Sequence, residues 1–302
     1  MNKNWLIIGL AALSWPNHAF AWSFLPHKVI GQLAQNRLSP RTLEKVNDLL
    51  GPNIGLADIA ACADQMRGGP ITCAGAFRVP SLPASSAWHY ISIPIDHSPS
   101  ENTLGQYCKK GCVVDAVKQN LKTLSDPWTS RHQKQIALMF VVHFVGDLHQ
   151  PLHDSSEFYR DAQGGDDRGG NNKPVTFIHK PTNLHSLWDG MVKERDIMQS
   201  TNIEKYAEWL ENGDKGIARK DISTWLKGDL VAGPALESFA IAKGIYKEYN
   251  KDCTAAIAGD DNCGHNFKGK YRDAMQPVVM ERMQQAGVRL AAMLEQALMQ
   301  AP

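Results

Sequence analysis

The stretch that decides the fold is His143-Phe144-Val145-Gly146-Asp147-Leu148-His149-Gln150-Pro151-Leu152-His153-Asp154, with three histidines and two aspartates in twelve residues. It follows a wholly apolar run, residues 136–142, which is too short for a transmembrane helix because such a helix needs about 20 apolar residues. The run therefore predicts a buried helix over residues 132–149. On this helix His143 and Asp147 lie four residues apart and project from one face. Since polar groups on a buried face are costly unless they are paired or bind a metal, the pair predicts metal ligands.

Pro151 disfavours helical geometry at Gln150, so we expect the helix to kink or end there. His153 would then leave in a different direction and serve a neighbouring metal ion. The alternative is an ordinary helix end whose polar side chains are satisfied by hydrogen bonds. For any single histidine of the stretch, both interpretations stay open.

The first 21 residues have the features of a signal peptide. Lys3 supplies the positive charge, residues 5–15 supply a short apolar segment, and Ala19-Phe20-Ala21 is an A-x-A cleavage site. A membrane anchor is the alternative, but the apolar segment is too short for one. We therefore expect cleavage after Ala21, a mature single domain over residues 22–302, and a secreted or periplasmic location, as in an exported bacterial protein.

The charge balance argues against a protein that binds nucleic acid through an overall positive charge. The chain has 32 basic and 31 acidic residues, a formal net charge of +1. Such a chain has no global basic field with which to bind nucleic acid. Any attraction to phosphate must therefore be local.

The cysteines indicate disulfides. An even number of cysteines in an exported chain predicts three disulfide bonds, and fifteen pairings are possible. Closeness in sequence favours the pairs 62–73, 108–112 and 253–263. A zinc–thiolate site is the rival interpretation, weakened by export and by the wide separation of the pairs. The six residues are Cys62, Cys73, Cys108, Cys112, Cys253 and Cys263.

Hydrophobic periodicity and turn residues predict a mostly α single-domain bundle of several helices with short β segments. Ser39 is expected to cap a helix that has Pro40 at its first position. Strand signals are few, and only residues 88–94 look extended. The helices are expected near residues 27–38, 40–50, 56–67, 111–124, 132–149, 183–192, 203–212, 235–249 and 272–299.

Candidate metal ligands recur elsewhere in the chain. His185 and Asp189 repeat the spacing of His143 and Asp147 on a second predicted helix, and each such pair forms a rigid two-point chelate. Zinc prefers histidine nitrogen and carboxylate oxygen, and a catalytic zinc keeps one position open for water. The further candidates are His27, Asp64, His89 and His153.

At this point the motifs resemble those of a known family. In chain order they are Trp22-x4-His27, Ala63-Asp64-x2-Arg67, Trp88-His89-Tyr90, the stretch from His143 to His153, Gly169-Gly170-Asn171 and Asn183-Leu184-His185-x2-Trp188-Asp189. The chain resembles the zinc-dependent single-strand nucleases of the S1/P1 type, which share a helical fold and a three-zinc site with bacterial zinc phospholipases C. The resemblance covers residues 22 to about 192 by motif and extends more loosely to the end.

The resemblance implies three zinc ions with the following ligands: Asp64, His89, His143 and Asp147 for the first; His153, His185 and Asp189 for the second; and His27, Asp147 and the amino nitrogen and carbonyl oxygen of Trp22 for the third. An α-amine has a pKa of about 7.7–8.0 and can bind a metal near neutral pH, but only after the signal peptide has been removed. The alternative for Trp22 is a simple buried aromatic residue. His149 is not a ligand in the family and is expected to be structural.

The resemblance also implies catalytic and substrate-binding roles. Asp64 would orient the attacking water, and Arg67 would donate hydrogen bonds to the phosphoryl group. Tyr90 would stack on a base, and Asn171 would bond to the base edge. Ser92 stands where fungal members carry an acidic residue that reads the base, and Arg168 replaces an apolar residue, so both are candidate substrate-binding positions. Surface charge is the alternative role for either arginine.

Together these features predict an exported zinc-dependent endonuclease. It would hydrolyse single-stranded DNA and RNA to 5′-phosphorylated products, with 3′-nucleotidase activity on nucleotides as a further expectation. Clustered zinc lowers the pKa of bound water from 15.7 to about 7, so zinc-bound hydroxide would be the nucleophile. The enzyme is expected to be a monomer without a membrane span.

Two alternatives stay open at this point. A zinc phospholipase C would use the same scaffold, but that family places Glu at the position of Asp189. A non-enzymatic zinc-binding protein would have no need of Arg67 or a stacking residue. A metalloprotease is disfavoured because the sequence lacks His-Glu-x2-His.

Overall fold

The computed structural model describes residues 22–109, 111–158, 165–191, 202–251 and 265–300. These residues are mostly helical, as the sequence predicts, with a few short strands. The α-helices are α1 (Phe24–Asn36), α2 (Pro40–Leu50), α3 (Leu56–Ile59), α4 (Cys62–Gln65), α5 (Val113–Ser125), α6 (Arg131–Asp147), α7 (Leu184–Asp189), α9 (Ile203–Asn212), α10 (Arg219–Trp225), α11 (Ala232–Tyr249) and α12 (Gly269–Gln300). The 3₁₀ helices are η1 (Met66–Gly68), η2 (Pro83–His89), η3 (Leu104–Tyr107) and η4 (Pro151–His153). The strands are β1 (Ile71–Cys73), β2 (Phe77–Val79), β3 (Pro174–Phe177), β4 (Lys180–Asn183) and β5 (Asn266–Phe267).

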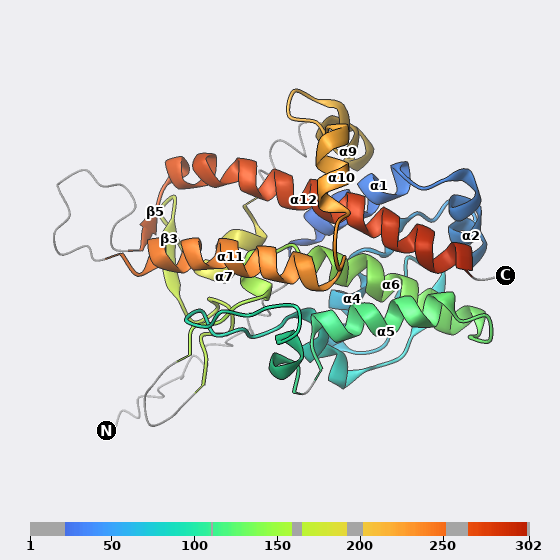
Figure 1. Cartoon of the computed structure of the whole chain (residues 1–302), viewed down its shortest axis with the longest axis horizontal. Helices are drawn as coiled ribbons and strands as arrows, with labels where there is room; N and C mark the ends of the chain where they lie inside the picture. Colours follow the sequence, from blue (N-terminus) through green and yellow to red (C-terminus); the bar gives the residue numbers. More distant parts are fainter. Residues whose placement is uncertain (1–21, 110, 159–164, 192–201, 252–264, 301–302) are drawn as a thin grey trace, which may run out of the picture.

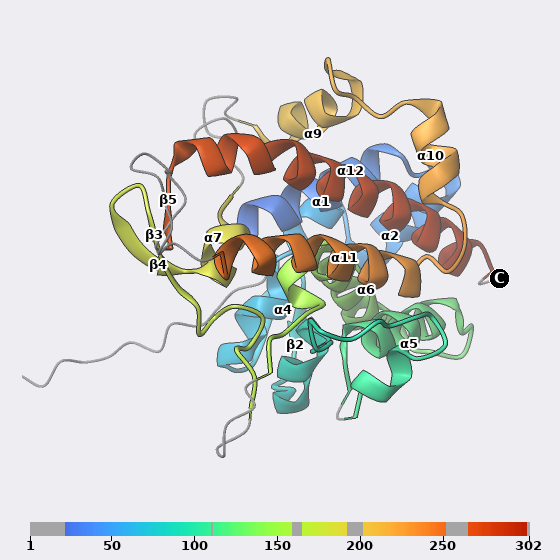
Figure 2. The same ribbon diagram turned by 60° about the vertical axis from the view of Figure 1, so that its left-hand side comes forward.

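Helix α6 is the centre of the packing. All residues from 137 to 147 are buried, and α1, α5 and α12 pack against this helix. Helices α11 and α12 lie side by side over it, and α12 runs along most of the long axis of the molecule (Figures 1 and 2). One connected hydrophobic cluster includes residues from Trp22 to Leu298. A helix buried on all sides explains why the run before His143 is wholly apolar.

The ends of α6 follow from its sequence. Ser130 and Gln133 form a capping box, in which the Gln133 backbone nitrogen donates to Ser130 Oγ at 3.3 Å and the Ser130 nitrogen donates to Gln133 Oε1 at 3.2 Å. The helix ends at Asp147, two residues earlier than predicted. Pro151 then occupies the first position of η4, which carries His153 away from the α6 axis.

Ser39 caps α2 as predicted. Its hydroxyl oxygen accepts a hydrogen bond from the Thr42 backbone nitrogen at 3.3 Å, and Pro40 stands at the first helical position. The predicted pattern of cap and proline therefore forms in this helix.

The strands form two small sheets. β1 pairs antiparallel with β2, with Ile71 opposite Val79. β3 pairs antiparallel with β4 and parallel with β5, in the strand order β4-β3-β5. The β3–β4 hairpin leads directly into α7, so it positions the helix that carries His185 and Asp189.

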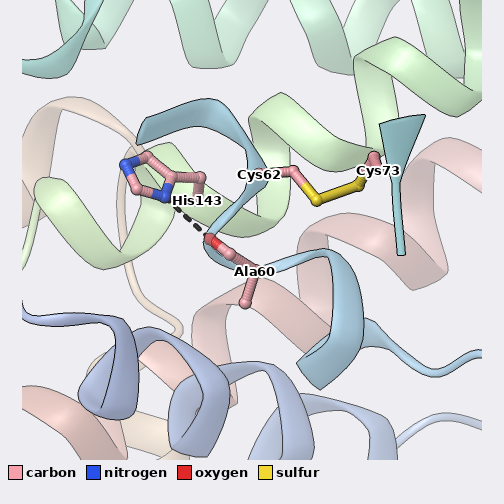
Figure 3. The surroundings of a disulfide bond; sticks show 4 residues. All are labelled: Ala60, Cys62, Cys73 and His143. Atoms are coloured by element: carbon pink, nitrogen blue, oxygen red, sulfur yellow. Dashed lines mark hydrogen bonds between the residues drawn. A yellow bond between two sulfur atoms is a disulfide. The ribbon is translucent and has the colours of Figure 1, made fainter. Parts of the chain in front are cut away.

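Two of the expected disulfides are present. Cys62 pairs with Cys73 and Cys108 pairs with Cys112, with Cα–Cα distances of 5.6 and 5.0 Å. The first bond joins α4 to β1 (Figure 3). Cys253 and Cys263 lie outside the described residues. The zinc–thiolate alternative is excluded for the four described cysteines because all their sulfur atoms are in disulfides.

Two local predictions were wrong. Residues 56–67 do not form one helix, because the chain bends at Ala60 and Ala61 and divides the segment into α3, α4 and η1. Residues 88–94 are not all extended, because η2 continues to His89 and extended backbone angles begin at Tyr90. Among the described residues, no helix is both long and apolar enough to cross a membrane.

Candidate metal centre

The end of α6 brings two predicted ligands together. His143 and Asp147 are fully buried one turn apart, with His143 Nε2 3.3 Å from Asp147 Oδ2. His143 Nδ1 donates to the Ala60 carbonyl oxygen at 2.7 Å, and Figure 3 shows this bond between α6 and the bend after α3. The spacing of four residues therefore does place both side chains at one buried point.

Asp64 and His89 join this pair from two other segments. Asp64, on α4, has its Oδ1 3.6 Å from His89 Nδ1 and 3.7 Å from His143 Nε2. His89 Nδ1 lies 3.1 Å from Asp147 Oδ2. Three distant parts of the chain thus converge on one set of nitrogen and oxygen atoms.

His27 and Trp22 reach the site from the N-terminal side. His27 Nε2 lies 3.3 Å from Asp147 Oδ1, and the His27 ring stacks on His143 with centroids 4.0 Å apart. Asp147 therefore directs one oxygen toward His27 and the other toward His89 and His143. The buried indole of Trp22 donates to the Gly146 carbonyl oxygen at 3.0 Å, beside Asp147.

His153, His185 and Asp189 form a neighbouring group. His185 and Asp189 lie one turn apart on α7, with Nε2 and Oδ2 3.6 Å apart. The ring of His153, from η4, lies 4.8 Å from that of His185. Gln150 Nε2 donates to Asp189 Oδ1 at 2.6 Å and fixes this carboxylate.

Three of the five histidines are oriented by backbone carbonyls. His153 Nδ1 donates to the His89 carbonyl oxygen at 2.6 Å, and His185 Nδ1 donates to that of Gly169 at 2.7 Å, as His143 does to that of Ala60. A carbonyl oxygen can only accept, so each ring must carry hydrogen on Nδ1. Each Nε2 then faces the site, which is the arrangement of a metal-ligating histidine.

The electrostatics of the site favour a cation. Burial lowers the pKa of His27 to about 4 and that of His185 to about 3, so both rings stay neutral and can act as ligands. Burial acts in the same direction on His143, but the carboxylates of Asp147 and Asp64 outweigh it and raise the pKa of that ring to about 9. These two buried carboxylates thus favour a positive charge beside them, and a divalent metal ion bound there would supply it.

The donor set fits metal ions. Within the described part of the chain, both carboxylate oxygens of Asp64 and Nε2 of His153 are buried without a hydrogen bond. Three groups made only of His and Asp bring their ligand atoms within 4.8 Å of one another. They are His27, Asp64 and His143; His89, His143 and Asp147; and His153, His185 and Asp189.

A cavity of about 230 Å³ opens above this site. Its wall includes three of the predicted ligands, His89, His153 and His185, so this group of side chains is accessible from solvent. Arg67, from η1, lies on the wall with Nη1 3.6 Å from Asp64 Oδ1, and Tyr90 is 44% exposed. Every predicted substrate-binding residue lines the cavity: Tyr90, Ser92, Arg168 and Asn171.

Sequence reasoning missed several residues at the site. Gln150 was not among the predicted site residues, although its place between the predicted ligands Asp147 and His153 is the signal for a supporting role. Ser86 and Asp166 also line the cavity, and no motif marked them. His149 is buried, with Nδ1 donating to the Val145 carbonyl oxygen and Nε2 accepting from Arg289, in agreement with a structural role.

Buried His and Asp side chains beneath an open cavity are a donor set that could hold metal ions for hydrolysis. A family model for the S1/P1 nucleases matches residues 22–299. The chain is similar to Nuclease S1 of Aspergillus oryzae, with 29% identity over 303 residues that cover 96% of each chain. It is similar to Nuclease P1 of Penicillium citrinum, with 30% identity over 222 residues, which are 70% of this chain and 74% of the relative.

A plant relative, Endonuclease 1 of Arabidopsis thaliana, is 28% identical over 307 residues, covering 96% of this chain and 91% of the relative. The chain therefore belongs to the S1/P1 nuclease family. It is a hydrolase that cleaves the phosphodiester bonds of nucleic acids, and the phospholipase and non-enzymatic alternatives are set aside.

Proposed function

We propose that this nuclease is a zinc-dependent endonuclease that prefers single-stranded DNA and RNA. It releases 5′-phosphorylated products and also acts on nucleotides as a 3′-nucleotidase. The mature enzyme is a monomeric single domain, residues 22–302, exported from a bacterial cell to the periplasm or the medium. The observation that carries the proposal is the cavity, because its wall brings together metal ligands, an arginine and an exposed aromatic ring.

Zinc suits the donor set, because it binds histidine nitrogen and carboxylate oxygen. The first ion would be held by Asp64, His89, His143 and Asp147; the second by His153, His185 and Asp189; and the third by Trp22, His27 and Asp147. The two oxygens of Asp147 point toward different histidines, which supports a bridging role. When bound, the ions would supply an activated water and neutralise charge on the phosphate.

The N-terminal ligand depends on signal-peptide cleavage after Ala21. Trp22 is already anchored at the site by its indole, and the neighbouring Ser23 nitrogen donates to the Asp189 carbonyl oxygen at 3.1 Å. A free amino group at residue 22 would therefore lie close to Asp147 and His27. An extra residue before Trp22 is expected to remove one zinc ion per molecule, measured by elemental analysis, and full zinc content in that variant would contradict the assignment.

The chain's own side chains divide the catalytic work. Asp64 accepts a hydrogen bond from the attacking water and orients it toward the phosphorus atom. Arg67 donates to a phosphoryl oxygen and stabilises the negative charge that gathers there in the transition state. A guanidinium group suits this role because it remains protonated at every working pH.

The remaining side chains on the wall select the substrate. Tyr90 stacks on a base, an interaction of about 1–3 kcal/mol that tolerates any sequence, and Asn171 bonds to the base edge. A base can reach Tyr90 only if it is unpaired and turned out of a stack, which accounts for the preference for single strands. Ser92 is uncharged and places no acidic group at the base edge, while Arg168 favours anionic substrates.

The test compares hydrolysis of one labelled oligonucleotide as a single strand and as a duplex. The single strand is expected to be cut faster, excess chelator to abolish cleavage, and zinc to restore it. His143→Ala should lose activity, whereas His132→Ala, an exposed histidine at the other end of α6, serves as the matched control and should keep it. Undiminished cleavage of the single strand in excess chelator would refute the proposal.

A further inference from the structure

Asp167 is a buried carboxylate that belongs to none of the proposed ligand sets. It is 0% exposed, its Oδ2 accepts a hydrogen bond from the Tyr246 hydroxyl at 2.7 Å, and its Oδ1 accepts one from the Glu157 backbone nitrogen at 2.9 Å. Burial and the nearby Asp167 raise the pKa of Tyr246 well above its usual range, so the hydroxyl keeps its proton and remains a donor. A carboxylate is costly to bury, so this one calls for a structural or functional reason.

The residues that follow Asp167 form a strained turn. Arg168, Gly169 and Gly170 have φ angles of 57°, 62° and 85°, a left-handed conformation that a residue with a Cβ rarely adopts. At Gly169 a Cβ would lie 2.3 Å from the Leu152 carbonyl oxygen, so only glycine fits. Such a turn persists only where surrounding contacts hold it, and the two hydrogen bonds to Asp167 hold its first end.

This turn carries a carbonyl that orients a metal ligand. His185 Nδ1 donates to the Gly169 carbonyl oxygen at 2.7 Å, which directs Nε2 toward Asp189 and His153. The Gly169 nitrogen in turn donates to Ser156 Oγ at 3.1 Å. A shift of the turn would therefore rotate the His185 ring away from its partners.

The same turn forms one wall of the cavity. Arg168 and Asn171 line it, and Asn171 Nδ2 donates to the Arg168 carbonyl oxygen at 2.8 Å. The Asn172 nitrogen closes the turn by donating to the Asp167 carbonyl oxygen at 3.0 Å. One buried anchor thus stands behind both a metal ligand and the side chains that face the substrate.

We propose that Asp167 and Tyr246 are positioning residues that fix the His153–His185–Asp189 metal site and the wall formed by Arg168 and Asn171. Helix α11, which carries Tyr246, lies beside the region of β3 and α7 in both views (Figures 1 and 2). The α11 helix thus supports the active site without touching metal or substrate. This inference rests on the proposed zinc-dependent function.

Tyr246→Phe tests the proposal, because it removes one hydroxyl and keeps the buried ring. The zinc ion proposed at His153, His185 and Asp189 should dissociate about 10–100-fold more readily, as is usual when a group that supports a metal ligand is lost. KM for a single-stranded oligonucleotide should rise as well, because Arg168 and Asn171 lose their fixed positions. Zinc competition with a chromophoric chelator measures the first effect, and anomalous scattering at the zinc edge locates the lost ion.

Tyr249→Phe is the matched control. Tyr249 lies on the same helix and is also buried, at 6% exposed against 2% for Tyr246, and its hydroxyl donates to the Pro174 carbonyl oxygen at 3.3 Å, outside the turn that follows Asp167. This variant also loses one hydroxyl, but it should keep zinc affinity and KM within about twofold of the wild type, a margin well inside the 10–100-fold effect expected of a lost supporting group. Thermal melting of both variants measures their loss of stability.

Three outcomes would overturn the proposal: unchanged zinc affinity and KM in Tyr246→Phe, equal weakening of all three ions, or the same losses in Tyr249→Phe. If Tyr246→Phe does not fold, Asp167→Asn is judged by the same criteria, since its amide cannot accept both hydrogen bonds in the same way. A wild-type protein without zinc would instead contradict the proposed function, so the two failures are distinguishable.

Discussion

Gly146 offers a direct test of how closely the metal centre is packed. It lies on α6 beside Asp147, and a Cβ at this position would lie 2.5 Å from His27 Nδ1 and 2.8 Å from His27 Cε1. Non-bonded atoms of this size are comfortable at about 3.5 Å, so in Gly146→Ala the His27 ring must move by about 1 Å. Metal–ligand distances tolerate shifts of only about 0.2 Å. The substitution should therefore displace His27 as a ligand.

Gly146→Ala should lose only a small part of the free energy of unfolding. Alanine favours a helix over glycine by about 1 kcal/mol, while overpacking a core costs about 1–3 kcal/mol. The net loss of about 0–2 kcal/mol is well below the roughly 5–15 kcal/mol that holds a typical domain folded. Gly146→Ala should thus fold, but it should bind the zinc ion proposed at His27 about 10–100-fold more weakly.

The assay is zinc content per molecule after dialysis at fixed free zinc, alongside thermal melting. Gly244→Ala is the control. Gly244 also lies in a helix but, unlike the buried Gly146, is exposed, and a Cβ there would meet no described atom beyond its own helix within 4 Å. The control should keep all its zinc and gain up to about 1 kcal/mol of stability. Wild-type zinc content in Gly146→Ala would refute the packing argument.

Three further perturbations test the fold and its metal dependence. Asp229→Ala should cost about 1 kcal/mol at pH 7, since Asp229 Oδ1 accepts hydrogen bonds from the Val231 and Ala232 nitrogens at the start of α11, at 2.8 and 2.9 Å. Burial raises the pKa of Asp229, but these hydrogen bonds outweigh it and hold the pKa in the folded state below its usual value. The bonds therefore stabilise the folded protein at pH values above the unfolded-state pKa of about 3.9. Melting at several pH values should therefore show the difference between wild type and variant vanishing as the pH falls through the folded pKa. Gly287→Ala should cost about 1–3 kcal/mol of stability, because its Cβ would lie 1.9 Å from Leu33 Cδ2 where α12 packs on α1. In denaturant titration, the loss in the double variant with Leu33→Ala should be smaller than the sum of the two single losses. Chelation should lower the melting temperature, because bound ions stabilise only the folded state, and an unchanged melting temperature would argue against tight metal binding.

Local patterns in the sequence were sufficient where the stabilising contacts are themselves local. Ser39 and Pro40 define the start of α2 through bonds within four residues. Cys62 and Cys73 pair as their short separation suggests. The apolar run before His143 forms a buried helix because the helix is surrounded on all sides.

Prediction failed where tertiary contacts decide the local structure. The segment 56–67 has a helical pattern throughout, but it bends near Ala60, whose carbonyl oxygen accepts from His143 on another helix. A carbonyl at a helix end is available for such a bond, and its partner lies 83 residues away. Helix α10 was missed for a different reason: all seven of its residues are described and none is buried, so it has no apolar periodicity.

In the candidate metal centre, too, local sequence patterns predict the ligand pairs, whereas tertiary contacts bring the pairs together. The spacing of His143 and Asp147, and of His185 and Asp189, predicts two chelating pairs from residues four apart. Their meeting with His27 could be expected only from the resemblance to a family, because no local pattern joins segments so far apart in the chain.

The orientation of the ligands lay beyond any sequence pattern. It depends on carbonyl oxygens, and every residue has a carbonyl, so Ala60 and Gly169 carry no chemical mark of their role. Gly169 belongs to the Gly-Gly-Asn motif, but only the structure shows that its carbonyl orients His185 and that its backbone angle and the Leu152 carbonyl exclude other residues. Part of this site is therefore built from backbone atoms, and the turn at Gly169 is held in an unusual conformation by the buried side chain of Asp167. It follows that substitutions at such supporting side chains should alter metal binding even though they leave every ligand in place.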